Sequence, residues 1–90
     1  MNLAPLTNKG FNILTDEGDV YASRKIERDG MPLEFNVYSD GALELVEYFQ
    51  EAMEDIISLG EVNSPEQAIY VFDVINSINT TGKHEIEKGK

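Results

Sequence analysis

The sequence has no cysteine, so it offers no thiol nucleophile, no disulfide bond and no thiolate ligand for a metal ion. Histidine occurs once, at His84, in a charged segment near the C-terminus. A catalytic triad or a metal site needs a rigid frame, and we expect His84 to be a solvated residue of a loose tail. We therefore expect a protein that is not an enzyme, with no metal and no cofactor.

Long apolar runs are missing as well. No stretch approaches the ~20 apolar residues of a membrane span, and the first residues lack the charged and apolar regions of a signal peptide. The glycines stand apart from one another and form no phosphate-binding loop. These absences favour a cytoplasmic protein.

Positive charge is scarce. The chain has 7 Lys and Arg residues against 17 Asp and Glu residues, which gives a net charge of −10 and a pI of about 4.3. A nucleic-acid binder needs cations to replace the counterions of the phosphates, and an anionic membrane repels an acidic surface. We expect neither nucleic acid nor membrane as a direct partner.

A chain of 90 residues is long enough for one small domain. Pro5 and Gly10 interrupt the first segment, and the last segment is charged. We expect an N-terminal lead-in over residues 1–10, a single domain over residues 11–79 and a flexible charged tail over residues 80–90.

Strand patterns dominate residues 11–38. A short apolar run at Phe11–Thr15 precedes the turn residues Asp16–Asp19, and two alternating segments flank Asp29-Gly30, a strong hairpin signal. A two-residue turn there pairs Arg28 with Met31, Ile26 with Leu33, Arg24 with Phe35, and Ala22 with Val37. The apolar residues of both strands then share one face. The register of the first hairpin stays open.

Two helices are expected after residue 40. Apolar residues spaced by three and four over residues 42–57 predict an amphipathic helix that begins at Ser39 or Asp40 and stops at Gly60. Ser64-Pro65-Glu66-Gln67 is typical of a second helix start, and residues 79–82 are its expected end. The expected inner stripe of this helix is Ala68, Phe72, Ile75 and Ile78. The predicted fold class is α+β, with a three-stranded antiparallel sheet and two helices on one face (β-β-β-α-α).

Charge is segregated along the chain. Between Asp29 and Gly82 there are eleven acids and no Lys or Arg. Five acids fall on one side of the expected first helix, where they repel one another without the usual neighbouring lysines. Such a field is typical of a surface that steers toward a cationic partner. The expected partner-binding residues are Asp29, Glu34, Glu44, Glu47, Glu51, Glu54 and Asp55.

The sequence allows other interpretations as well. The acids can serve solubility alone, and Tyr70 and Val74, off the inner stripe of the second helix, can form the seam of a small dimeric adaptor protein. Asp16-Glu17-Gly18-Asp19 has some features of a calcium loop but lacks its ligand spacing, so we expect an acidic turn. We expect a monomer rather than a homodimer.

The stretch from Ser23 to Asn79 resembles the small phage-encoded anti-CRISPR proteins, in particular the Listeria-phage inhibitors of type II-A Cas9. Asp29-Gly30 and the segment Val46–Met53 carry the resemblance. Met31-Pro32 stands where the family has an acid, and the loop Gly60–Glu66 is less acidic than the family's loop. The resemblance implies a DNA mimic in the host cytoplasm that blocks the nucleic-acid groove of a CRISPR effector, with Asp29 meeting the arginines that read the DNA.

Overall fold

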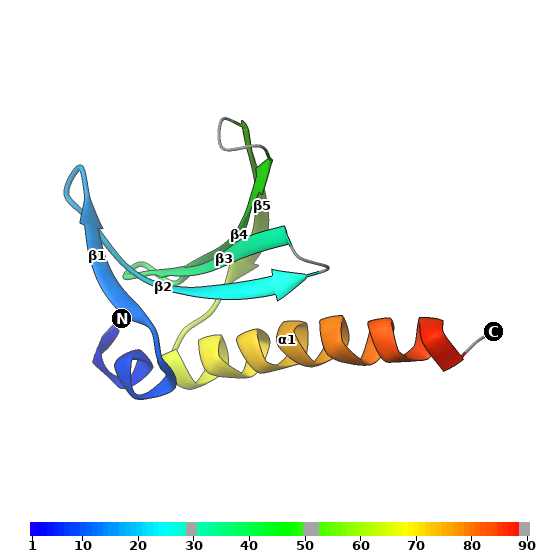
Figure 1. Ribbon diagram of the computed structural model, residues 1–90. Helices are drawn as coiled ribbons and strands as arrows, with labels where there is room; N and C mark the ends of the chain where they lie inside the picture. The colour runs from blue at the N-terminus through cyan, green and yellow to red at the C-terminus, as the bar shows by residue number, and fades with distance from the viewer. Residues whose placement is uncertain (29–30, 50–52, 89–90) are drawn as a thin grey trace.

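The structure is a computed structural model that describes the backbone of residues 1–28, 31–49 and 53–88, and the side chains of residues 1–26, 32–48 and 55–77. A short 3-10 helix, η1 (Ala4–Lys9), comes first, and one long helix, α1 (Pro65–Lys88), comes last. Between them lie β1 (Asn12–Asp16), β2 (Asp19–Arg28), β3 (Met31–Tyr38), β4 (Ala42–Phe49) and β5 (Met53–Glu61). The five strands form one antiparallel sheet in sequence order (Figure 1).

The predicted fold class is wrong, because residues 42–49 form β4 and residues 53–57 belong to β5, where a helix was expected. Leu45 and Val46 are both buried although they point to opposite faces of β4. A strand buried on both faces has apolar doublets such as Leu45-Val46, and β5 has a second, exposed doublet, Ile56-Ile57. Both doublets imitate helical spacing. In addition, no Gly, Pro, Asn or Asp marks residues 50–52 as a turn in the sequence.

The hairpin predictions agree with the structure more closely than the predicted helix at residues 42–57 does. All four expected pairs between β2 and β3 are confirmed, although Asp29 and Gly30 themselves lie outside the described residues. In the first hairpin, Asp16 pairs with Asp19 around Glu17 and Gly18, whose φ angles are 50° and 90°. Two positive φ angles in a two-residue loop define the hairpin turn that matches the twist of the strands. The acidic segment is therefore a tight turn.

Helix α1 begins as predicted. The Gln67 N–H donates to Ser64 Oγ (3.2 Å), and the Gln67 side chain accepts from the Asn63 N–H (2.7 Å). Ala68 and Phe72 are buried and Ile75 is partly buried, while the side chain of Ile78 lies outside the described part. The helix runs to Lys88, so the expected stop at residues 79–82 is wrong.

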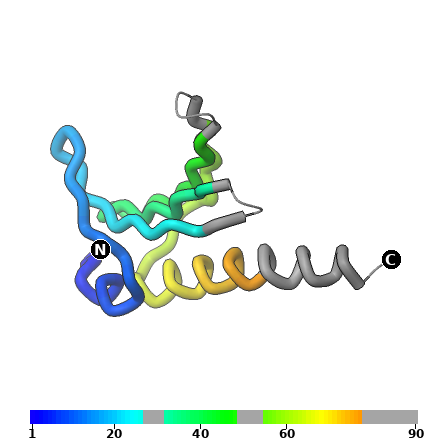
Figure 2. The backbone as a smooth tube through the Cα atoms, in the orientation of Figure 1, coloured from blue at the N-terminus to red at the C-terminus, as the bar shows by residue number. Residues whose placement is uncertain are grey.

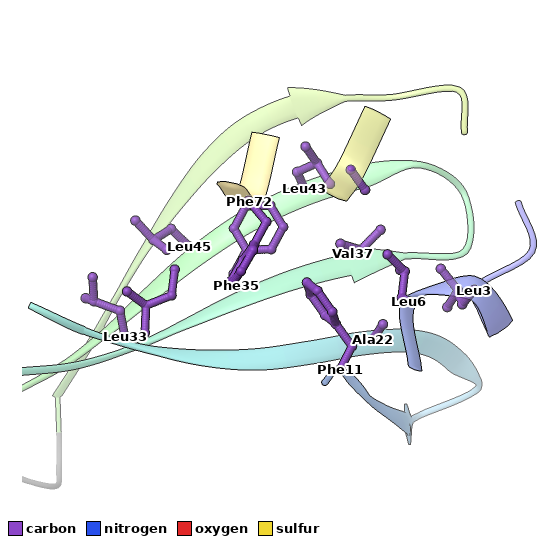
Figure 3. Close-up of a cluster of buried hydrophobic side chains, with 12 residues drawn as sticks. Leu3, Leu6, Phe11, Ala22, Leu33, Phe35, Val37, Leu43, Leu45 and Phe72 are labelled. Atoms are coloured by element: carbon purple, nitrogen blue, oxygen red, sulfur yellow. The ribbon is translucent and has the colours of Figure 1, made fainter. Parts of the chain in front are cut away.

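The core lies between α1 and one face of the sheet (Figure 3). Phe11, Phe35 and Phe72 meet edge to face, with ring centroids 5.2–6.1 Å apart. The segment expected to be a lead-in supplies two core side chains, Leu3 and Leu6. It lies beside the start of α1 (Figure 2).

Candidate functional site

No helix of the described part of the chain covers one face of the sheet, and we call this the open face. Leu33, Phe35 and Val37 point toward α1, so the alternate residues of β3 point to the open face. Both outer hairpins curl away from α1 around this face (Figure 1). The register places Tyr21, Ser23, Lys25, Glu34, Asn36, Tyr38, Glu44, Val46, Tyr48 and Ile56 there.

The predicted acids divide between the two faces. Glu34 and Glu44 lie on the open face, whereas Glu47 and Asp55 lie opposite each other on the face toward α1. Glu54 pairs with Tyr48 in the β4–β5 ladder. The side chain of Glu54 and those of Asp29 and Glu51 lie outside the described residues. The expected acidic face of a helix is therefore wrong.

Two tyrosine hydroxyls form hydrogen bonds with the carboxylates of Glu34 and Glu44 on the open face. The Tyr48 hydroxyl donates to Glu34 Oε1 (2.7 Å), and the Tyr38 hydroxyl donates to Glu44 Oε2 (3.2 Å). In both cases the tyrosine reaches diagonally to the neighbouring strand. A carboxylate accepts several hydrogen bonds, so each Glu keeps acceptor capacity for another group.

Tyr38 is in addition stacked on Tyr21, with ring centroids 5.0 Å apart and an interplanar angle of 24°. Burial, together with the charge and the hydrogen bond of Glu44, raises the pKa of Tyr38 to about 12. The phenol therefore stays protonated at neutral pH and keeps donating to Glu44.

A polar pair lies beside these tyrosines. Ser23 and Asn36 are cross-strand partners, and both are buried. Asn36 Oδ1 has no hydrogen-bond partner within the described part of the chain. Next to this pair lies an open hollow of about 590 Å³, lined by Gly10 and by residues of the strands β1 to β3. Its lining residues are Gly10, Asn12, Leu14, Ser23, Arg24, Lys25 and Glu34.

The described cations near this surface have local roles. Arg24 Nη1 donates to the Lys9 carbonyl oxygen (2.7 Å), and the guanidinium lies 4.7 Å from the centroid of the Phe72 ring. This arginine therefore ties η1, β2 and α1 together. Lys25 pairs with Glu34 in the β2–β3 ladder.

The described side chains contain no group of three or more His, Asp or Glu that could hold a metal ion. His84 falls within α1, but its side chain lies outside the described part. Of the helical segments that the structure describes, none has the length and apolar character needed to cross a membrane.

The tyrosine–carboxylate pairs were not predicted, because the sequence assigned Glu44 and Tyr48 to a helix. A strand pattern in the sequence could have indicated these pairs, since Leu43 and Leu45 are two residues apart, as are Val46 and Tyr48. This period of two competes with the helical spacing of the same segment. Asn36 gave no signal, since its burial depends on the neighbouring strands.

Comparisons with protein-family models, curated proteins and solved structures give no match to this chain. The resemblance to anti-CRISPR proteins therefore stays a prediction. Part of its basis differs in the structure, because Val46–Phe49 belongs to β4 and Met53 to β5, where a helix was expected.

Proposed function

We propose that this protein is a non-enzymatic inhibitor that binds the basic nucleic-acid groove of another protein through its open face. The observation that carries the proposal is the pair of carboxylates, Glu34 and Glu44, fixed in place by tyrosine hydroxyls. Preorganised acceptors bind guanidinium and ammonium groups with less loss of side-chain entropy. A CRISPR effector such as Cas9 is the member of this partner class that the sequence resemblance names.

Charge supports the same proposal. The net charge of −10 favours encounter with a basic surface, and it accelerates association most at low salt. The stretch from Asp29 to Gly82, which includes β3, β4, β5 and most of α1, has eleven acids and no base. Occupation of the groove would exclude the nucleic acid, so inhibition needs no catalytic group.

The test uses the whole chain, immobilised and exposed to a bacterial lysate over a series of salt concentrations. We expect capture of a nucleic-acid-binding protein that elutes with rising salt and that added DNA or RNA displaces. Capture that nucleic acid does not displace would overturn the proposal.

Purified partner then allows a comparison of variants. We expect the double variant E34Q/E44Q to associate more slowly, with a weaker dependence on salt. The matched control is E66Q/D73N, which removes two exposed acids of α1 and the same formal charge. Equal association rates for the two variants would show that net charge, rather than the open face, drives binding.

A second candidate is the dimeric adaptor. Tyr70 is 70% exposed and Val74 is 37% exposed one turn later on α1, which is an apolar strip with no cover in the described part. Light scattering of the wild type and of V74K distinguishes this candidate. A dimer that V74K disrupts favours the adaptor.

A further inference from the structure

Strand β5 forms one edge of the sheet, since the strand order ends with it (Figure 3). It is nine residues long, while β1 at the other edge has five. The side of β5 that faces away from β4 has no strand partner among the described residues. Such an edge presents a row of backbone N–H and C=O groups to a new strand.

The side chains of β5 protect this edge only in part. Natural edge strands are protected by lysine, by proline or by other charges, and Met53–Glu61 contains three acids but neither lysine nor proline. Ile56 is 57% exposed on the open face, and Ile57 is 39% exposed on the face toward α1. An added strand would therefore cover apolar surface on both faces of the sheet.

We propose that β5 pairs with β5 of a second copy of this chain, in antiparallel orientation about a two-fold axis beside Ile56. This inference goes beyond the proposed function, because it concerns the backbone edge of β5 rather than the carboxylates Glu34 and Glu44. The result is one continuous sheet through both copies, with an isologous interface.

The register follows from the sequence of β5. A two-fold axis beside Ile56 places Ile56 opposite its own copy and places Asp55 opposite Ile57 of the second copy. Glu54 comes opposite Ser58. Within Met53–Ser58 this register places no carboxylate directly opposite another, an arrangement that would destabilise the pairing. The irregularity in the β4–β5 pairing lies beyond Ser58, so Met53–Ser58 is available as a regular strand.

Long-range charge opposes this dimer, since each copy carries −10. The screening length falls from roughly 10 Å at 0.1 M salt to about 3 Å at 1 M. The dimer should therefore strengthen with salt, whereas binding of a basic partner should weaken. The opposite salt dependences separate a failure of this inference from a failure of the proposed function.

Sedimentation equilibrium of the full chain at about 0.1 M and about 1 M salt tests the inference. We expect a monomer–dimer equilibrium whose dissociation constant falls at least about tenfold at the higher salt. The variant I56K should raise that constant at least about tenfold, because it places a lysine at the centre of the interface. The control V74K adds the same charge on α1 and should change it less than about twofold.

A cross-linking experiment tests the register. The chain has no cysteine, so I56C introduces the only thiol. Directly opposed residues of antiparallel strands have Cα atoms about 4.5–5.5 Å apart, which a disulfide can span. We expect I56C to form a cross-linked dimer on mild oxidation, and S58C and V74C to form far less. A monomer at both salt concentrations, or preferential cross-linking of V74C, would overturn the inference.

Discussion

Tyr38 on β3 and Glu44 on β4 are joined across the open face by a hydroxyl–carboxylate hydrogen bond of 3.2 Å. We expect Y38F to lower the free energy of unfolding by about 0.5–1.5 kcal/mol, because the ring is kept and one partly buried hydrogen bond is lost. Urea unfolding measures this change. The control Y70F removes a hydroxyl from a tyrosine that is largely exposed and should have almost no effect. An equal loss in both variants would contradict the role of Glu44.

The same pair predicts a pH effect. The pKa of Tyr38 is raised from 10.0 to about 12, chiefly by burial and then by Glu44, so the folded state holds this proton more tightly than the unfolded state. The corresponding stability is complete below pH 10 and is lost as the pH rises through 12.

Tyrosinate absorbance, measured as the difference between wild type and Y38F, reports this titration. We expect a step near pH 12 that E44Q shifts toward 10. A difference step at the ordinary tyrosine value, in the folded wild type, would contradict the prediction.

Asp55 stands opposite Glu47 on the face toward α1. Like charges in directly opposed positions destabilise a sheet, and opposite charges stabilise it. We expect D55K to raise the free energy of unfolding by about 0.2–1 kcal/mol at low salt, and by less at high salt. D73K makes the same charge change on α1, away from this pair, and serves as the control. A gain of the same size in D73K would assign the effect to net charge.

Gly41 adopts a φ of +100°, and a Cβ atom there would collide with the carbonyl oxygen of Val62. The Val62 N–H donates to the Gly41 carbonyl oxygen (2.9 Å), so neither backbone can move away freely. The backbone conformation alone costs an L-residue about 1–2 kcal/mol, and the collision adds to it. We expect G41A to lower the free energy of unfolding by more than about 2 kcal/mol. Thermal or urea unfolding measures this change.

Gly18 provides the matched comparison for that variant. Its φ is +90°, and a Cβ atom there would have no neighbour within 4 Å. We expect G18A to lower the free energy of unfolding by only about 1–2 kcal/mol, which is the cost of the backbone conformation alone. Equal losses in G18A and G41A would show that the contact with Val62 adds nothing.

Phe72 is the largest side chain that α1 contributes to the described core, and it contacts the rings of Phe11 and Phe35. We expect F72A to lower the free energy of unfolding by about 3–5 kcal/mol. A loss of this size is enough to unfold many domains as small as this one. F72L tests the same contact in a milder form, with an expected loss nearer 1.5 kcal/mol or less. V74A, on the exposed side of α1, is the control. A loss in F72L no greater than in V74A would contradict the role of Phe72 in the core.

Local signals were sufficient for part of the fold. The β2–β3 register follows from Asp29-Gly30 and the alternation on both sides, because a hairpin turn and a common apolar face agree on one pairing. The start of α1 follows from Ser64 and Gln67, whose capping bonds involve only neighbouring residues.

The rest depends on contacts between distant segments. Val46 is buried on the open face only because the neighbouring strands surround it, so its presence beside Leu45 could not be distinguished from a helical pattern. The candidate site could not be predicted for the same reason. Tyr38 and Glu44 lie six positions apart in the sequence and meet only through the β3–β4 pairing, which the predicted helix precluded.

The sheet and the core have different requirements during folding. Every strand pairs with its neighbour in sequence, so the sheet can form from short-range contacts alone. The core cannot, because Leu6 near one end of the chain and Phe72 far along it fill the same space. On the ribosome, the meander can therefore emerge and pair while its apolar face stays uncovered until α1 is released. Synthesis of this protein includes an interval in which an exposed apolar sheet depends on the rapid arrival of the last helix.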